Sequence, residues 1–245
     1  MKTLILVTIY TFEFTFICMI AASFYFLLER YKLSDKYKVI SSLAFLTTIL
    51  AVIEYYKMHS FFTLDALLLK NYRFPTEFRY ITWLVATPIM LSIFFVLSGM
   101  NKTHKKTILT VLSLNFMMIT FGYFSETSFS KKTFDFNFTL LMFACSFSCW
   151  LLIVWIYNSY LPKEVKKIKT SNKNDLLKCI NILNKFVTYG WAIYPLGLLI
   201  IFYDYNPETM LMRELVYNFG DLFNKIGFSM VCFFCAIKLS KIKSY

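Results

Sequence analysis

One lysine lies in the middle of a long apolar stretch near the end of the chain. Lys225 falls within residues 215–237, and Asp221 precedes it by about one helical turn. A charged amine at the centre of a bilayer is costly, so it is expected to be neutralised, paired or used for chemistry. A spacing of four puts both side chains on one face of a helix, where Asp221 can hold a protonated nitrogen.

Two interpretations of this pair remain open from the residues alone. An amine in an apolar pocket can condense with an aldehyde to form a Schiff base. The alternative is a buried ion pair that only fixes the packing of the helices. The two interpretations differ in what surrounds the lysine, because a rigid apolar ligand needs planar side chains on both of its faces.

The composition is that of a membrane protein. Hydrophobic residues make up 58% of the 245 residues and charged residues only 16%. Apolar runs long enough to cross about 30 Å of hydrocarbon occur at residues 4–28, 39–56, 80–97, 108–124, 136–157, 180–203 and 215–237. The connections are short. We therefore predict an all-α membrane protein, a seven-transmembrane-helix bundle in contact with membrane lipid, with residues 1–245 forming a single domain.

The formal net charge of +12 follows the connections between these runs. Basic residues gather in the first, third and fifth connections and in the tail: Arg30, Lys32, Lys36, Lys38, Lys102, Lys105, Lys106, Lys163, Lys166, Lys167, Lys169, Lys173, Lys238, Lys241 and Lys243. The positive-inside rule places these segments in the cytoplasm of a multi-pass cell-membrane protein, with the N-terminus outside and the C-terminus inside. The other connections carry carboxylates: Asp65, Glu77, Glu126, Asp135, Asp204 and Glu208. This distribution argues against a nucleic-acid partner.

The cysteines and histidines do not indicate an enzyme. The six cysteines form no metal or disulfide framework, and Cys232 and Cys235, although spaced like a redox motif, are predicted to be packing residues within a helix. His59 and His104 lie in connections and receive no catalytic role. Neither a nucleophile with an adjacent base nor a metal-ligand cluster is apparent.

Four segments resemble microbial (type 1) rhodopsins of the proteorhodopsin-like branch. Residues 217–226, Tyr-Asn-Phe-Gly-Asp-Leu-Phe-Asn-Lys-Ile, resemble the last helix of that family, and residues 190–195, Gly-Trp-Ala-Ile-Tyr-Pro, resemble its Trp-x-x-Tyr-Pro retinal-pocket motif. Residues 78–83, Phe-Arg-Tyr-Ile-Thr-Trp, followed by Thr87 and Pro88, resemble its helix-three pattern. The first connection, at residues 27–38, also looks proteorhodopsin-like.

The resemblance implies a buried all-trans retinal bound to Lys225 as a Schiff base, with Asp221 as a counterion. Trp83, Trp191 and Tyr194 would then sandwich the polyene. The resemblance assigns the remaining pocket positions to Thr82, Thr87, Met90, Met118, Ser146, Trp150 and Pro195. It also implies a homo-oligomer, because related proteins assemble as pentamers or hexamers.

Three positions depart from the pattern of proton-pumping relatives. Thr82 replaces the helix-three Asp that acts as counterion and first proton acceptor, and Ile93 replaces the cytoplasmic proton donor. Ala86 stands where Thr is usual, whereas Arg79 is retained. A Thr cannot accept the Schiff-base proton, so outward proton pumping is not expected. The order Thr82, Ala86, Thr87 resembles the Thr-Ala-Thr motif of TAT rhodopsins.

These departures predict a photoreceptor in which light isomerises retinal without efficient proton pumping, and which senses light through an unidentified signalling partner. One alternative is a light-driven inward anion (chloride) pump, because halide pumps also carry Thr at the place of Thr82. They follow it with Ser where this chain has Ala86. A light-gated channel is the other alternative, because conduction depends on the hydration of the pore.

Glu54 lies in the second apolar run, at the place where proteorhodopsins carry a His. It either partly replaces the missing helix-three Asp or, being near the helix end, reaches interfacial water. With Asp221 it is also a candidate calcium site, since carboxylate oxygens are ligands for calcium. The missing Asp favours the neutral Schiff base, so visible and near-UV absorbing forms are expected at mildly alkaline pH. Glu13 in the first run receives no chemical role.

Overall fold

The computed structural model describes residues 2–61, 76–129, 134–167 and 173–240. Within these residues, seven helical spans are long and apolar enough to cross a membrane. The first four spans are α1 (Lys2–Leu28), α2 (Lys38–Phe61), α4 (Glu77–Ser98) and α5 (Lys105–Ser128), and a 3-10 turn, η1 (Glu29–Lys32), extends α1. The charges predicted for connections and tail at Asp65, Lys169, Lys241 and Lys243 lie outside the described residues.

The last three spans each contain a π-helical turn. The fifth is α6 (Phe136–Trp155), η2 (Ile156–Tyr160) and α7 (Leu161–Lys167), and the sixth is α8 (Lys173–Lys185), η3 (Phe186–Gly190) and α9 (Ile193–Tyr203). The seventh is α10 (Pro207–Asp221), η4 (Leu222–Gly227) and α11 (Phe228–Ser240). Turns of this kind are rare and are frequently found at functional sites. Here η4 carries Lys225.

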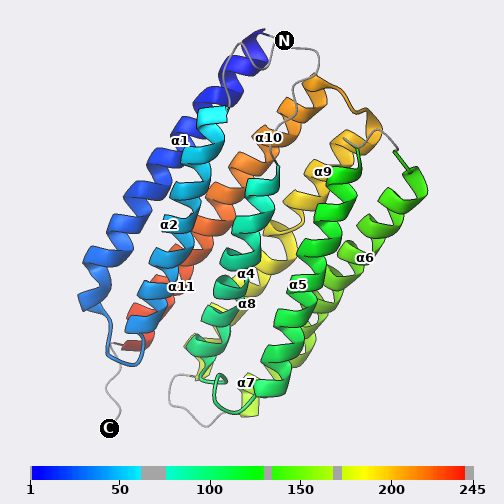
Figure 1. Cartoon of the computed structure of the whole chain (residues 1–245). Helices are drawn as coiled ribbons and strands as arrows, with labels where there is room; N and C mark the ends of the chain where they lie inside the picture. The colour runs from blue at the N-terminus through cyan, green and yellow to red at the C-terminus, as the bar shows by residue number, and fades with distance from the viewer. Residues whose placement is uncertain (1, 62–75, 130–133, 168–172, 241–245) are drawn as a thin grey trace.

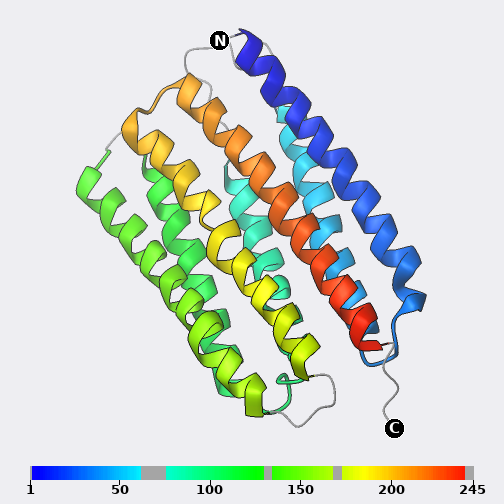
Figure 2. The ribbon, with the colours of Figure 1, turned by 180° about the vertical axis from the view of Figure 1, so that it is seen from behind.

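The spans lie side by side and pack in chain order (Figure 1). α1 contacts α2, α2 contacts α4, α4 contacts α5, and α5 contacts α6. α9 contacts α10, and α10 packs against α1, so the last span returns to the first, as the view from behind also shows (Figure 2). The predicted seven-transmembrane-helix bundle is confirmed.

The two halves of the bundle interior differ in character. Around the end of α4 and along α8 and α11, the core is aromatic and aliphatic and includes Ile93, Phe94, Leu183 and Phe233. Toward the start of α10, buried arginines and carboxylates lie among smaller apolar clusters. Charged side chains are rarely buried unless they are paired, so the second half is where chemistry is expected.

The prediction that Glu126 lies in the fourth connection is wrong. The apolar run ends at Phe124, but α5 continues to Ser128 and its last turn is buried. Only 3% of Glu126 is exposed. The apolar run identified the part of α5 that faces lipid and the apolar core. It did not include the last turn of the helix, which is polar and faces other buried polar groups.

The prediction of no disulfide among the cysteines is also wrong. Cys179 of α8 and Cys235 of α11 are bonded across the sixth and seventh spans, with their Cα atoms 5.9 Å apart. The pair lies 56 residues apart in sequence, so local spacing gave no indication of it. Cys232, the other half of the apparent redox motif, is a free buried cysteine.

Candidate functional site

Lys225 is buried and makes two ion pairs. Its Nζ lies 2.8 Å from Oε2 of Glu54 and 3.0 Å from Oδ2 of Asp221. Glu54 comes from α2, whereas Asp221 precedes Lys225 on the same span. Both carboxylates can therefore stabilise a proton on Nζ, and the predicted pairing of Asp221 with Lys225 is present.

Glu54 does not reach interfacial water, so that alternative is wrong. Only 2% of the residue is exposed, because it faces Lys225 and Arg79 inside the bundle, and α2 continues nearly two turns beyond it to Phe61. Its second oxygen, Oε1, lies 4.0 Å from Nη1 of Arg79. The carboxylate that the sequence lacks at Thr82 is thus supplied beside Lys225 by the neighbouring helix.

Asp221 is fixed by three further donors. Tyr194 donates its hydroxyl to Oδ1 at 2.8 Å, and Tyr55 donates to Oδ2 at 2.9 Å. Arg79 Nη1 donates to the same Oδ2 at 3.4 Å. Hydrogen bonds to an ionised acceptor favour its charged form and hold it in one orientation, so Asp221 is a preorganised countercharge for Nζ.

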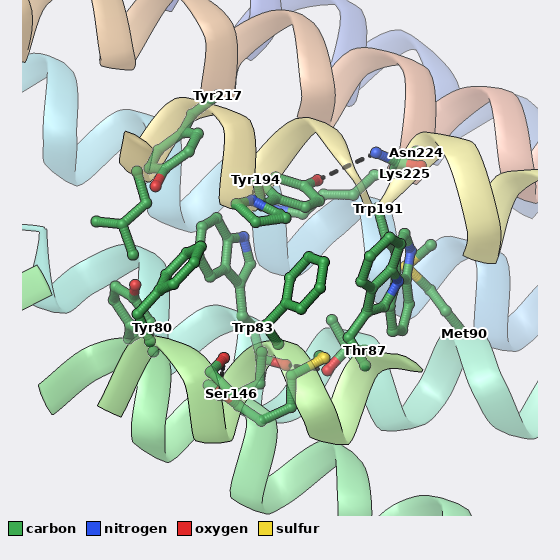
Figure 3. A pocket seen from close by; sticks show the side chains of 18 residues that line it. Tyr80, Trp83, Thr87, Met90, Ser146, Trp191, Tyr194, Tyr217, Asn224 and Lys225 are labelled. Carbon is green, nitrogen blue, oxygen red and sulfur yellow. Dashed lines mark hydrogen bonds between the residues drawn. The ribbon is translucent and has the colours of Figure 1, made fainter. Parts of the chain in front are cut away.

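A mostly apolar cavity extends from Lys225 between α4, α5, α6 and α9 (Figure 3). Trp83, Trp191 and Tyr194 point toward it from α4 and the sixth span. The cavity is lined by Tyr80, Trp83, Thr87, Met90, Met118, Ile119, Gly122, Phe143, Ser146, Phe147, Trp150, Trp191, Tyr194, Pro195, Leu198, Tyr217, Asn224 and Lys225.

The structure brings together most of the residues predicted from the sequence. Thr87, Met90, Met118, Ser146, Trp150 and Pro195 all line the cavity with the aromatic residues named above. Thr82 and Ala86 are not among the lining residues, although they lie on α4 with Trp83. Thr82 is partly buried and Ala86 fully buried.

The arrangement fits a long, planar, apolar aldehyde. A buried amine lies in the cavity wall, aromatic side chains supply flat apolar surfaces, and two carboxylates lie beside the amine. The indole nitrogen of Trp83 is buried without a hydrogen-bond partner among the described residues, so its ring is placed by packing. A cavity with these walls and one buried amine is what retinal bound to Lys225 requires.

Arg79 connects this site to a second group of buried charges. It donates to Glu214 through Nη2 at 2.8 Å and through Nε at 3.1 Å. Arg213 contacts the other oxygen of Glu214 at 2.6 Å and Oε1 of Glu126 at 2.8 Å. Charges of opposite sign therefore alternate from Lys225 toward the start of α10.

At the end of this array farthest from Lys225, hydroxyl groups donate hydrogen bonds to Glu126. Tyr80 donates to Oε2 of Glu126 at 2.9 Å and Tyr217 donates to the same atom at 3.4 Å. Thr76 donates to Oε1. Every oxygen of Glu126 thus has a donor, which compensates for its burial.

Sequence reasoning missed Arg213, Glu214 and Glu126, and the tyrosines around them. Arg213 and Glu214 directly precede the apolar run at residues 215–237, so the run does not include them. Adjacent opposite charges at the start of an apolar run were the available signal. Tyr55 follows Glu54 directly, but nothing in the sequence placed its hydroxyl beside Asp221.

The π-helical turns η3 and η4 contact each other next to Lys225. Asn224 of η4 donates through Nδ2 to the carbonyl oxygen of Gly190 in η3 at 2.8 Å. A methyl group at Gly190 would lie 2.2 Å from Oδ1 of Asn224. Phe186 of η3 also stacks on Phe223 of η4, with ring centroids 4.8 Å apart. The close approach of the sixth and seventh spans therefore depends on a glycine at this position.

Comparisons with known proteins agree with this geometry. The sequence model of a family described as bacteriorhodopsin-like proteins matches residues 7–239. The chain belongs to this family. It is a retinal-binding microbial rhodopsin, and its relatives include proteorhodopsins.

Individual relatives show how far the similarity extends. The chain is 24% identical to the green-light absorbing proteorhodopsin of the gamma-proteobacterium EBAC31A08 over 225 residues, 91% of this chain and 83% of the relative. It is 26% identical to the blue-light absorbing proteorhodopsin of the gamma-proteobacterium Hot 75m4 over 227 residues, with the same coverages. The crystal structure of Exiguobacterium sibiricum rhodopsin superimposes with a TM-score of 0.89 at 31% identity, covering 97% of this rhodopsin and 98% of that chain.

Gly190→Ala is expected to disturb the site through Asn224. The added methyl group forces Asn224 away, which separates η3 from η4 and moves Lys225, so the visible band of the retinal-loaded protein shifts or is lost and its melting temperature falls. Asn224→Ala removes the obstacle. The Gly190→Ala/Asn224→Ala double variant is therefore expected to be more stable than the sum of the single effects predicts. Strict additivity in absorption-monitored melting would contradict the proposed coupling between the two turns.

Proposed function

We propose that this rhodopsin is a photoreceptor that senses light through retinal bound at Lys225 and does not pump protons efficiently. Bound retinal supplies light absorption and isomerisation at the end of the Lys225 side chain. The protein supplies the charges that hold the proton on Nζ. The observation that carries the proposal is the contrast between the two sides of Lys225, one rich in buried carboxylates and the other apolar.

On the first side, Glu54 is placed to accept the proton from Nζ. Its Oε2 is within direct hydrogen-bonding distance, and Asp221 is held by Tyr55, Tyr194 and Arg79. A general base must lie within such a distance of the proton it removes. Loss of the helix-three Asp therefore does not remove the acceptor from the site, but moves it to α2.

On the apolar side of Lys225, no carboxyl group among the described residues is placed to return a proton to Nζ. Ile93 is fully buried in the apolar core, among Phe94, Phe228 and Cys232. Among the described residues, every buried carboxylate belongs to the array around Lys225 and α10, namely Glu54, Glu126, Glu214 and Asp221. Reprotonation is slow under these conditions, and a long-lived deprotonated form suits signalling better than sustained transport.

Inward anion transport is less well supported by the geometry. An anion next to Lys225 would need the space and the positive charge that Glu54 and Asp221 already use. Two carboxylates so close to the amine repel a further anion. The charge array equally gives no specific support for a light-gated channel.

The proposal includes the finer assignments made from sequence. The Thr82, Ala86, Thr87 order supports a TAT-rhodopsin type of protein, and the basic clusters support an outside N-terminus and a cytoplasmic C-terminus. Resemblance to oligomeric relatives supports a pentamer or hexamer that acts on a signalling partner. Calcium binding by Glu54 and Asp221 stays a prediction. The ion pairs to Lys225 and Arg79 argue against it, and the described residues contain no group of three or more His, Cys, Asp or Glu side chains placed to hold a metal.

Lys225→Ala is expected to give a colourless protein when it is expressed with retinal, because Lys225 is the amine on the cavity wall. Lys238→Ala is the matched control: Lys238 lies on the same span but pairs with Asp175 near the surface, so its removal should leave the visible band intact. The absorption spectrum of each purified variant is the measurement. A normal band in Lys225→Ala without added amine would show that retinal is held elsewhere.

Glu54→Gln is expected to lower the pH at which the visible form converts to the near-UV form. The protonated nitrogen loses a stabilising charge, so its neutral form gains population at lower pH. A charge at about 4 Å and an effective dielectric of about 20 corresponds to about 4 kcal/mol, so the midpoint falls by up to about three pH units. Glu13→Gln, which removes an exposed carboxylate on α1, is the control.

Spectral titration from neutral to strongly alkaline pH checks this expectation, and repeating it with calcium tests the metal prediction. An unchanged midpoint in Glu54→Gln would exclude Glu54 as the countercharge. A calcium-induced shift in the wild type that disappears in Glu54→Gln would establish calcium at this site, whereas an equal shift in both proteins would place calcium elsewhere.

Illumination of cells that contain the protein is not expected to acidify a lightly buffered medium, because the apolar side of Lys225 slows proton return. The measurement is external pH under light, with and without a protonophore. Protonophore-sensitive acidification comparable to that of a proton pump in the same host would contradict the proposal. Chloride-dependent alkalinisation that increases with protonophore would favour the anion pump.

A further inference from the structure

The disulfide between Cys179 and Cys235 joins the two spans that meet at the π-helical turns. Cys179 lies on α8, about two turns before η3, and Cys235 lies on α11, about two turns after η4. Both residues are more than nine-tenths buried. Their Cα separation of 5.9 Å falls within the usual range for a disulfide, about 4.4–6.8 Å.

A second contact holds the same two helices one turn further along. Lys238 Nζ on α11 lies 2.8 Å from Oδ1 of Asp175 on α8. Both side chains of this ion pair are partly exposed, so it contributes little to stability by itself. The covalent link is therefore stronger than this polar contact, and it adds to the apolar packing of α8 against α11.

The other ends of α8 and α11 lead directly to the retinal cavity. α8 continues through η3 to Trp191, which lines the cavity, and α11 begins directly after η4, which carries Lys225. Irregular turns let a helix bend at a defined place. A force on Trp191 or Lys225 can thus swing α8 relative to α11, and a bond between Cys179 and Cys235 opposes that separation.

We propose that Cys179 and Cys235 form a redox modification site that sets how fast the rhodopsin returns to its dark state. In the dithiol form α8 and α11 separate after illumination, and in the disulfide form they are held together. The reaction partner is a small-molecule disulfide of the glutathione class, which reaches the two buried thiols when the ends of α8 and α11 open locally. One cysteine thiolate attacks it and releases one thiol, and the second cysteine displaces the other thiol. Two protein thiols are thereby oxidised to one bond while the small disulfide is reduced to two thiols.

The predicted orientation gives this site a physiological meaning. It places the ends of α8 and α11 that carry the two cysteines on the cytoplasmic side, where glutathione and thioredoxin keep most thiols reduced. The dithiol is then the resting form. When the cytoplasm becomes more oxidising, the disulfide forms and the lifetime of the light-activated state changes. The site couples a chemical signal to the same element that responds to light.

The test uses the full chain loaded with retinal, equilibrated with either oxidised glutathione or dithiothreitol. Mass spectrometry of the alkylated, digested protein measures the Cys179 to Cys235 bond, and flash photolysis measures dark-state recovery. The bonded protein is expected to recover about fivefold faster or more, because the bond opposes the separation of α8 and α11; fivefold corresponds to about 1 kcal/mol of activation free energy. Cys179→Ser and Cys235→Ser should each abolish the difference between the two conditions.

Cys232→Ser is the matched control, because Cys232 is buried one turn away on α11 but is free. It should keep the full redox difference. Absence of the bond in the wild type under oxidising conditions, or a redox difference that persists in Cys179→Ser, would overturn the proposal. The disulfide is measured without light, so its formation is tested even in protein that fails to bind retinal. Failure to bind retinal would instead count against Lys225 as the retinal site.

Discussion

The burial of Lys225 is the constraint on which the rest of the site depends. A charged amine inside the bundle is tolerated only if opposite charges compensate the water it has lost. Asp221 and Glu54 provide that compensation. Arg79 pairs with both carboxylates, and the hydroxyl groups of Tyr55 and Tyr194 donate to Asp221. Arg79 in turn requires Glu214, which brings in Arg213 and Glu126. One buried amine thus explains why a whole half of the interior is polar.

The irregular turns on the sixth and seventh spans follow from the same requirement. Lys225 must face two carboxylates and an apolar cavity at once, and a π-helical turn re-aims side chains relative to those before and after it. The turns leave the carbonyl oxygen of Gly190 available to Asn224, which joins the two spans at the level of the amine. The sixth and seventh spans are therefore joined at two places, at the level of the amine and by the bond between α8 and α11.

The sequence predicted the bundle and the Asp221–Lys225 pair because those features have a local signature, whereas most of the cavity residues were predicted from the resemblance to microbial rhodopsins. Long apolar runs define spans, and a spacing of four pairs Asp221 with Lys225. The residue pattern of α2 does not show which neighbouring helix Glu54 faces. The sequence therefore could not decide between the two roles considered for Glu54. Glu126 was misplaced because a helix that ends in buried polar contacts looks like a loop by its hydropathy. The disulfide depends on the packing of α8 against α11, which residue spacing does not encode.

The balance of charge decides how the site responds to light. Four buried carboxylates, Glu54, Glu126, Glu214 and Asp221, face three buried cations, Lys225, Arg79 and Arg213, within the array described above. With every carboxylate ionised the array already carries excess negative charge, so it favours a proton on Nζ in the dark. Transfer of that proton to Glu54 leaves the total unchanged and only moves the charge toward Arg79. The array can therefore retain the proton within the protein, and such retention supports the proposed light-sensing role over a cycle that exports a proton at each turn.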